Sequence, residues 1–348
     1  MTSFDDTEYP AAPYPGARPP FSYVYDDAGW EIKADQTALS GWRVGDEDLD
    51  GWLGERGWRP MAQRVPVLAY GSNPNPSKLA WLKSALGLTG AVVVLRARCE
   101  DIAAVWASGL RVVDDQRPVT LTALPGAVED HAVMMLTQDQ VAVLDVCEGR
   151  GDRYNLARVS TGRVTLSDSG AILDRVLAYV AASDIRKPLL VNGSPVRCAD
   201  VPQEAAIALT GQPAATDGLA VEILPGAPDP GDYPGSLFVY GTLRPGDSHW
   251  HLLAPQSSGP ARDARLTGSL YDTGYGYPAL ALGEGPGVHG SVVPLREGAD
   301  LAEVDAYEGE RYARMRVVLA DGTFTWTYVW IAPVAGMSVL TGPWRPRS

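Results

Sequence analysis

Two loops with the same sequence pattern follow apolar strands in widely separated parts of the chain. Residues 67–76 read "VLAYGSNPNP" and residues 237–246 read "LFVYGTLRPG". A glycine at such a sharp turn lets consecutive backbone N–H groups face a ligand, where they can hold a carboxylate or a developing oxyanion. We therefore expect two substrate-binding corners, formed by Tyr70, Gly71, Ser72 and Asn73 in one loop and by Tyr240, Gly241, Thr242 and Leu243 in the other.

A second pattern, a glutamate followed by glycine and then by tyrosine, also occurs twice. It is found in residues 144–154 ("LDVCEGRGDRY") and 304–312 ("VDAYEGERY"). A glutamate at a helix end, opposite a glycine corner and shielded by tyrosine rings, has a raised proton affinity and can act as a general acid and base. We predict Glu148 and Glu308 as catalytic residues and Tyr312 as a pocket contact. Each motif alone is common, so the signal lies in both motifs recurring in the same order.

The elements around these motifs also repeat, which favours an internal duplication. In the first half, short strands are expected at "VPVLAY", "AVVVLRAR", "VTLTAL" and "HAVMML". Helices are expected over residues 76–86 and 137–149, where Thr137 is a good N-cap and Gly149 a good terminator. From residue 236 a similar order of strand, sharp turn, strands, short helix and strands begins again. We expect a first domain over 65–182, an insertion and linker over 183–235 with one Ala-rich helix, and a second domain over 236–348.

The N-terminal extension, residues 1–64, is acidic and rich in tryptophan. Residues 1–20 are proline-rich with little to bury and are expected to be loose. Farther along, Trp30, Trp42, Trp52 and Trp58 present more aromatic surface than a protein leaves in water. The extension is therefore expected to pack on a domain as an arm.

Composition narrows the classes of partner. The formal net charge of −13 disfavours nucleic acid and anionic membrane surfaces. Three cysteines and four histidines without HExxH or CxxC spacing predict neither a disulfide framework nor a metal site. No signal peptide and no apolar run of membrane-spanning length is visible, so we expect a cytoplasmic protein.

The second half resembles the gamma-glutamylcyclotransferase-like family, in particular its gamma-glutamylamine and butirosin-pathway branch. The resemblance rests on "FVYGTLRPG", "GSLYDTGYGYPAL", "VHGSVVPL" and "LAEVDAYEGERYARMRVVL" and covers residues 236–333. Residues 65–182 resemble the same family more faintly, through "AYGSNPNPSKL" and "LDVCEGRGDRY", and lack a "LYD…YPAL" segment. The resemblance implies an α+β protein with two tandem, small mixed β-barrels and flanking short helices.

The resemblance also implies a reaction. In that family the α-amine of a γ-glutamyl group attacks its own side-chain amide, which yields 5-oxoproline and a free amine or amino acid. Glu308 would take the proton from the attacking amine and return it to the leaving nitrogen, the loop Tyr240–Leu243 would hold the substrate, and Tyr277 would line the pocket. The partner is then a small γ-glutamyl substrate, and no cofactor is implied.

Two other functions fit the same residues. The loop and glutamate are compatible with hydrolysis or acyl transfer on another amide, and a tandem module that binds a metabolite or protein partner without catalysis is also compatible with them. The sequence does not determine the identity of the leaving group, the number of active domains or the oligomeric state.

Overall fold

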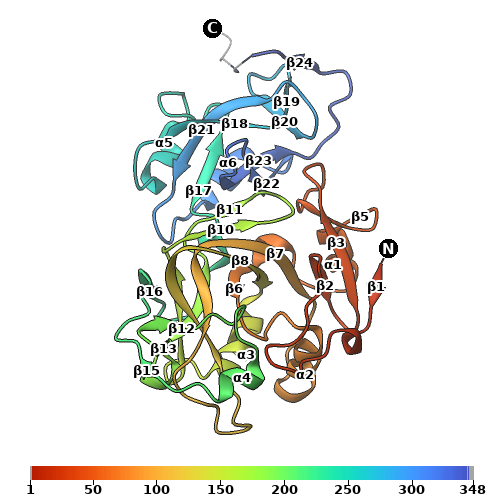
Figure 1. Ribbon diagram of the computed structural model, residues 1–348. Coiled ribbons are helices and arrows are strands. Elements are labelled where there is room, and N and C mark those ends of the chain that lie inside the picture. The colour runs from red at the N-terminus through yellow and green to blue at the C-terminus, as the bar shows by residue number, and fades with distance from the viewer. Residues whose placement is uncertain (1, 343, 345–348) are drawn as a thin grey trace.

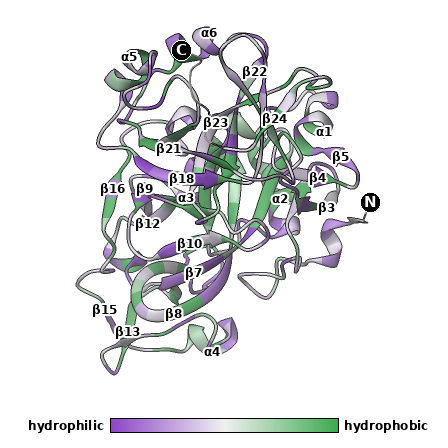
Figure 2. Ribbon diagram, turned by 90° about the horizontal axis from the view of Figure 1, so that it is seen from above, coloured by the Kyte–Doolittle hydropathy of each residue, from purple (hydrophilic) through white to green (hydrophobic). Residues whose placement is uncertain are grey.

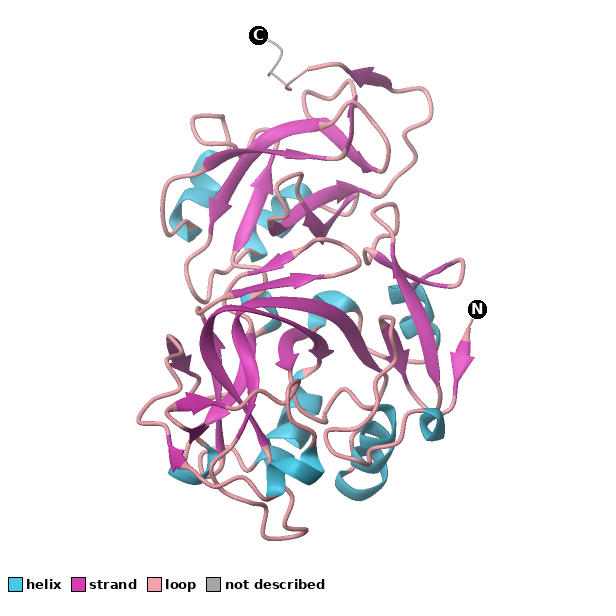
Figure 3. Ribbon diagram, in the orientation of Figure 1, coloured by secondary structure: helices cyan, strands magenta, loops and turns pink. Residues whose placement is uncertain are grey.

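The computed structural model describes residues 2–342 and 344. In Figure 1 the chain forms two parts, with residues up to about 235 in the lower part and the later residues in the upper part. Strands outnumber short helices in both parts (Figure 3), so the α+β class expected from the sequence is confirmed. Figure 2 shows hydrophobic strand segments running through the middle of the molecule.

The lower part is built on one 13-stranded sheet whose main path runs β16-β9-β12-β6-β8-β7-β2-β3-β4-β5. The first corner follows β6, which pairs with β8 on one side and β12 on the other. The strands after the extension are β6 (Val65–Ala69), β7 (Val92–Trp106), β8 (Val119–Leu136), β9 (Tyr154–Val159), β10 (Arg163–Leu166), β11 (Ile172–Leu173) and β12 (Leu177–Ala181).

The long hairpin of β7 and β8 differs from the prediction. The segments "VTLTAL" and "HAVMML", expected as two strands, are the two ends of the continuous strand β8. The register between β7 and β8 shifts between Glu100 and Ile102, where Asp101 has a φ of 62°. Such a β-bulge bends a strand without ending it, and the hairpin therefore curves over the lower part (Figure 1).

The two long helices of the lower part lie where the sequence placed them. They are α2 (Pro76–Leu86) and α3 (Gln138–Glu148). Thr137 caps α3 by accepting a hydrogen bond from the Gln140 N–H, and Gly149 ends it in the left-handed conformation at φ 61°. This αL turn directly follows Glu148 and so determines where the first glutamate lies.

The extension joins the large sheet instead of forming a separate unit. Strand β2 pairs with β7, and β3 pairs with both β1 and β2. Trp42 and Trp52 are buried, as expected for a packed arm. Its elements are β1 (Ser3–Phe4), η1 (Asp6–Glu8), β2 (Tyr23–Tyr25), β3 (Gly29–Ala34), β4 (Trp42–Val44), β5 (Glu47–Asp48), α1 (Leu49–Glu55) and η2 (Met61–Gln63).

The expectation that residues 1–20 are loose is wrong. The Asn75 side-chain amide donates hydrogen bonds to the carbonyls of Tyr9, Pro10 and Ala17. The Ser77 hydroxyl donates to the carbonyls of residues 6 and 9. Phe4 of this segment is buried in the core, where its ring packs against that of Tyr23 at 5.4 Å. Polar side chains at the start of α2 also fix the backbone of the segment, through contacts between distant residues that composition does not reveal.

Residues 183–235 contain short elements that cover the lower part. Strands β13, β14 and β15 form a small sheet of their own, and β16 pairs with β9 in the large sheet. The predicted Ala-rich helix is confirmed as α4. The bounds are η3 (Asp184–Arg186), β13 (Leu189–Val191), β14 (Ser194–Pro195), α4 (Gln203–Ile207), β15 (Gln212–Pro213), β16 (Val221–Ile223) and η4 (Pro230–Asp232).

The upper part contains a five-stranded sheet in the order β18-β21-β17-β23-β22 and a three-stranded sheet in the order β20-β19-β24. The second corner follows β17, which pairs with β21 and β23. The elements are β17 (Ser236–Val239), α5 (Trp250–Leu253), η5 (Ala254–Gln256), β18 (Arg262–Leu266), β19 (Gly268–Asp272), β20 (Pro278–Leu282), β21 (Val288–Pro294), α6 (Ala302–Glu308), β22 (Tyr312–Val318), β23 (Phe324–Trp330) and β24 (Ser338–Leu340).

The expected closed β-barrels are not present among the described residues. Closure requires the two outer strands of a sheet to pair with each other. In the upper part β18 and β22 are the ends of the five-stranded path, and β19 and β20 belong to a separate sheet. In the lower part the sheet continues into the extension through β2, so it does not close on itself.

Both corner strands are buried on both faces. Along β17, Leu237 and Val239 lie in one hydrophobic cluster, whereas Phe238 and the following Tyr240 lie in another. The same alternation holds in the lower part, where Leu68 and Tyr70 share a cluster and Val67 and Ala69 share the opposite one. Successive side chains of a strand point to opposite faces, so the tyrosine of each corner is anchored in a core.

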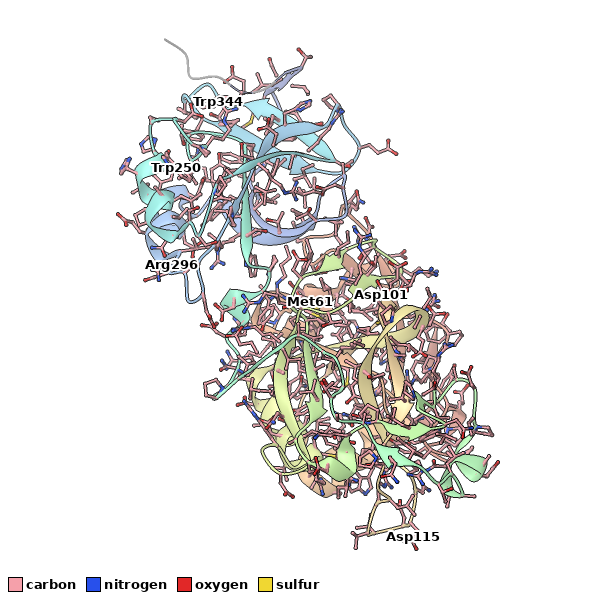
Figure 4. The ribbon with its side chains drawn as sticks, turned by 60° about the vertical axis from the view of Figure 1, so that its left-hand side comes forward. Met61, Asp101, Asp115, Trp250, Arg296 and Trp344 are labelled. Carbon is pink, nitrogen blue, oxygen red and sulfur yellow. The ribbon has the colours of Figure 1, made fainter. Side chains whose placement is uncertain are left out.

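One arginine of the upper part is inserted between the two parts. The Arg316 guanidinium on β22 donates hydrogen bonds to five backbone carbonyls, those of Met61, Ala62, Arg64, Pro230 and Tyr233. Figure 4 places Met61 near the junction, with Trp344 in the upper part and Asp115 at the far end of the lower part. These bonds join β22 to the end of the extension and to the linker.

Candidate active site

The upper corner and its glutamate line one cavity of about 430 Å³, here called the C-terminal pocket. The corner follows β17, and the glutamate ends α6. All the residues predicted from the second half line it, namely Tyr240, Gly241, Thr242, Leu243, Tyr277, Glu308 and Tyr312. Further lining comes from Pro278, Tyr307, Glu310, Arg311, Tyr328 and Trp330, among others.

The corner presents backbone donors without acceptors. The N–H groups of Gly241, Thr242 and Leu243 donate to no acceptor among the described residues. Unpaired amides in a cavity wall are suited to hold a carboxylate or an oxyanion. The Tyr240 hydroxyl is already engaged, since it donates a 2.7 Å hydrogen bond to the Tyr328 carbonyl. Tyr240 therefore anchors the corner, and the residues after it line the cavity.

Glu308 is the lining carboxylate that the sequence predicted as catalytic. It is the last residue of α6, and Gly309 turns the chain away at φ 70°. Burial, with a smaller contribution from the negative charge of Asp305, raises its pKa to about 7. No hydrogen bond or ion pair joins the Glu308 carboxylate to any described residue. A carboxylate with this pKa can both accept and return a proton near neutral pH.

Aromatic rings form the wall next to Glu308. The Tyr312 hydroxyl donates a 2.7 Å hydrogen bond to the Pro278 carbonyl, and its ring packs edge-on against Trp330 at 5.1 Å. The Tyr277 ring lies 6.4 Å from Tyr312. The hydroxyls of Thr242 and Tyr307 are 2.8 Å apart. These rings cover part of the cavity wall beside the carboxylate, which agrees with burial as the main cause of its raised pKa.

The lower corner lines a larger cavity of about 630 Å³, here called the N-terminal pocket. Tyr70, Gly71, Ser72, Asn73 and Glu148 all line it, as predicted from the first half. The N–H groups of residues 71–73 also lack acceptors among the described residues. The Arg18 side chain of the extension donates hydrogen bonds to the carbonyls of Tyr70 and Gly71, on the other side of the same peptides.

Glu148 differs from Glu308 in having a partner. The Asn73 side-chain amide donates a 2.7 Å hydrogen bond to its carboxylate. Burial raises the pKa of Glu148, while that hydrogen bond and the nearby charges of Lys78, Arg153 and Arg186 act in the opposite direction. Cys147, which precedes it, has a pKa raised by burial, so its thiol is protonated and a poor nucleophile.

The same hydrogen-bond relay supports both glutamates. In the upper part Tyr240 donates to the Tyr328 carbonyl, and the Tyr328 hydroxyl donates to Asp305 at 2.7 Å. In the lower part the corresponding groups are Tyr70, the Tyr179 carbonyl and hydroxyl, and Asp145, with the last bond also 2.7 Å. Each aspartate lies three positions before its glutamate. The relay links each corner strand to the helix that ends in the glutamate.

Several lining residues were not predicted from the sequence. In the C-terminal pocket these include Tyr307, Arg311 and Trp330, of which Tyr307 and Arg311 stand within three residues of Glu308. In the N-terminal pocket they include Tyr14 and Arg186. Tyr14 lies in the segment expected to be loose and Arg186 in the segment expected to be an insertion, so no local pattern marked either.

The described residues contain no group of three or more His, Cys, Asp or Glu side chains placed to hold a metal ion. None of the helices in the described part of the chain is long and apolar enough to cross a membrane.

A carboxylate with a raised pKa beside free backbone amides is typical of enzymes that move protons on a small polar substrate. Residues 237–346 match the sequence model of the family described as "Gamma-glutamyl cyclotransferase, AIG2-like". The C-terminal part of the chain therefore belongs to this family, as its motifs predicted.

One relative gives a shorter match. The chain is 49% identical over 47 residues to a protein of Niallia circulans described as gamma-L-glutamyl-butirosin B gamma-glutamyl cyclotransferase. The match covers 14% of this chain and 30% of that relative.

Solved structures are similar over different lengths. YtfP of Escherichia coli is 33% identical to this chain, and the aligned region covers 31% of this chain and 93% of YtfP, with a TM-score of 0.23. The uncharacterised protein PH0828 of Pyrococcus horikoshii is 19% identical and covers 30% of this chain and 85% of its own, with a TM-score of 0.25. YkqA of Bacillus subtilis is 14% identical and covers 77% of this chain and 84% of its own, with a TM-score of 0.24.

Proposed function

We propose that the C-terminal pocket cyclises a γ-glutamyl amide to 5-oxoproline and releases the attached amine or amino acid. The observation that carries this proposal is the Glu308 carboxylate, with a pKa of about 7, in the same cavity as three amides of the Tyr240–Leu243 corner; neither the carboxylate nor these amides have a hydrogen-bond partner among the described residues. The family match of residues 237–346 and the name of the Niallia circulans relative support the same reaction class.

The proposed reaction requires the transfer of one proton and no other reactant. The α-amine of the substrate loses a proton to Glu308 and attacks the side-chain amide carbonyl, so that a C–N bond closes a five-membered ring. The carbonyl oxygen becomes an oxyanion, which the free N–H groups of the corner stabilise. Glu308 then returns the proton to the leaving nitrogen, and the original amide C–N bond breaks. The attack is intramolecular, so the protein has only to hold the substrate in a folded conformation.

We also propose that residues 65–182 and 236–348 are two copies of one cyclotransferase-like domain. Residues 1–64 would then be an added arm, and residues 183–235 an insertion and linker. The support is the matched relay of two tyrosines and an aspartate behind each glutamate. Glu148 is in this proposal the acid and base of the first copy.

The test is release of 5-oxoproline, measured by mass spectrometry, from γ-glutamyl amines, γ-glutamyl dipeptides and glutathione. Wild type is compared with Glu148→Gln, Glu308→Gln and the double variant. Loss of a positioned acid and base should lower kcat about 10²–10⁴-fold at the affected pocket. Glu303→Gln, an exposed change on the same helix as Glu308, is the matched control and should retain full activity. Undiminished release by the double variant, or release of glutamate in place of 5-oxoproline, would contradict the proposal.

A further inference from the structure

Arg186 is a buried arginine that forms no ion pair or side-chain hydrogen bond with the described residues, and it lines the N-terminal pocket. It is the last residue of η3, and only 6% of it is exposed. Its Nε and Nη1 atoms are buried and lack hydrogen-bond partners. No ion pair or side-chain hydrogen bond joins its guanidinium to any other described residue. Glu148, Tyr154 and Arg186 line the same cavity.

The backbone around Arg186 is held firmly. The Ser108 hydroxyl donates a 2.7 Å hydrogen bond to the Asp184 carbonyl, and the Gly109 N–H donates a 2.8 Å bond to the Ile185 carbonyl. The guanidinium carbon lies 5.9 Å from the centre of the Tyr154 ring. Arg186 is therefore fixed beside the pocket instead of extending into solvent, where an unpaired arginine would be ordinary.

A buried charge without a partner is costly, and proteins pair it or use it for binding. The planar guanidinium matches a carboxylate, which can accept two parallel hydrogen bonds from it. Glu148 carries a carboxylate in the same cavity, but its hydrogen bond comes from Asn73 and it forms no ion pair with Arg186. The guanidinium is therefore free to bind a ligand.

The two pockets also differ in charge. The N-terminal pocket is lined by four cationic side chains, Lys78, Arg111, Arg153 and Arg186, and by two acidic ones, Glu148 and Asp152. The C-terminal pocket is lined by one cation, Arg311, and by the acids Glu308 and Glu310. Arg111 forms an ion pair with Asp114. If Arg111 is therefore left out of the comparison, the lining of the N-terminal pocket still has a net positive charge. An anionic ligand is thus favoured in the N-terminal pocket.

We propose that the N-terminal pocket binds γ-glutamyl compounds with a second carboxylate on the leaving group, and that Arg186 pairs with that carboxylate. This proposal rests on the proposed function for the γ-glutamyl part of the ligand. Every γ-glutamyl group already carries an α-carboxylate, so Arg186 is assigned to a second carboxylate, the one on the leaving group. A buried, unpaired guanidinium has no counterpart among the described residues of the C-terminal pocket, whose one lining arginine, Arg311, is exposed. That pocket therefore suits neutral leaving groups.

Two ligands that differ in one charge provide the test. γ-Glutamylglycine carries the second carboxylate, and γ-glutamylglycinamide replaces it with a neutral amide of similar shape. Binding is measured by calorimetry on the full chain carrying Glu148→Gln and Glu308→Gln, so that neither ligand is consumed. Arg186→Met is compared with Arg163→Met, an exposed arginine outside both pockets.

Loss of a charged hydrogen-bonded pair should weaken γ-glutamylglycine binding about 10–100-fold in Arg186→Met. The affinity for γ-glutamylglycinamide should stay the same, and Arg163→Met should bind both ligands as the parent does. The melting temperature should not fall in Arg186→Met, because the change removes an unpaired buried charge. Equal affinities of the Arg186→Met variant and its parent for γ-glutamylglycine, or an equal loss for both ligands, would overturn the proposal.

Failure of the proposed function gives a different result. If the chain with both glutamates intact releases no 5-oxoproline, yet γ-glutamylglycine binding depends on Arg186, the proposed reaction is wrong and the carboxylate site stands. If Glu148-dependent release occurs at the same kcat/KM from both ligands in wild type and in Arg186→Met, the reaction stands and the role of Arg186 is wrong.

Discussion

The side-chain amide of Asn73 donates a 2.7 Å hydrogen bond to the carboxylate of Glu148. Asn73 belongs to the lower corner, so this bond ties the corner directly to the candidate acid and base. The upper pocket has Leu243 at the matching position after Tyr-Gly-Thr, and leucine cannot make such a bond. The two carboxylates are therefore held in different electrostatic surroundings although the relays behind them match.

Removing that bond should raise the pKa of Glu148. The bond stabilises the charged carboxylate, so in Asn73→Ala burial is opposed only by the more distant positive charges. Carbon-13 NMR of protein labelled at glutamate carboxyl groups measures the titration, and Glu148→Gln identifies the signal. A titration midpoint that stays the same or moves to lower pH in Asn73→Ala would show that the bond does not act on the ionised form.

The raised pKa of Glu308 should make the protein less stable as the pH rises. Folding raises the pKa of this carboxyl from 4.5 to about 7, so the folded state binds the proton more tightly than the unfolded state does. The stabilisation is complete below about pH 4.5 and is lost as the pH rises through about 7. Relative to wild type, Glu308→Gln should therefore gain stability progressively as the pH rises from about 4.5 to about 7, by on the order of 2 kcal/mol in total.

Urea unfolding at several pH values measures this difference. Glu303→Gln is the control, because Glu303 is exposed on the same helix and its replacement should leave the pH dependence unchanged. If the stability difference between Glu308→Gln and wild type does not vary with pH, the pKa of Glu308 is the same in the folded and the unfolded protein, which would contradict this prediction.

Loss of the Tyr240 hydroxyl should weaken the upper part. Tyr240→Phe leaves the Tyr328 carbonyl without its buried donor, which costs about 1–2 kcal/mol of unfolding free energy. Tyr275→Phe is the matched control, since Tyr275 is 71% exposed. Chemical denaturation compares the two variants. Equal stabilities would indicate that water replaces the missing donor.

Arg316→Met should uncouple the two parts of the molecule. Burial lowers the pKa of Arg316 to about 9, so the guanidinium is still charged at neutral pH, and its five bonds satisfy carbonyls of the extension and linker. Methionine preserves the apolar stem but none of these bonds, and we expect a loss of about 3 kcal/mol or more. Calorimetry should show the upper part melting at a lower temperature than in wild type, while Arg163→Met should melt as wild type. An unchanged melting profile in Arg316→Met would contradict this coupling.

Local signals in the sequence predicted the elements that carry both glutamates. The N-cap Thr137 and the terminator Gly149 set the ends of α3, and the Tyr-Gly pattern marked both corners. These features depend on residues within a few positions of one another, so they can be read without the fold. The merging of two expected strands into β8 depends on pairing across the long hairpin with β7, which no local pattern encodes.

The residues that complete the N-terminal pocket could not be predicted in this way. Arg186 reaches the pocket because the loop at Ser108 and Gly109 holds η3 in place, a contact across more than 70 residues of sequence. Tyr14 is positioned by Asn75, whose side-chain amide donates hydrogen bonds to backbone carbonyls that precede Tyr14 in the sequence and to one that follows it. Both cases are side chains from segments of unremarkable composition, positioned by distant polar contacts.

The pairing of β2 with β7 has a consequence for how the chain folds during its synthesis. Strand β2 leaves the ribosome about 70 residues before the start of its partner β7. At a synthesis rate of about 5–20 residues per second, several seconds pass between the synthesis of β2 and that of β7. During that interval Tyr23 and Tyr25, which are buried in the finished protein, are open to chaperones and to other nascent chains. Slowing translation between residues 25 and 92 would prolong this exposure, whereas a chain circularly permuted to place the arm after β7 would be made with its partner already present.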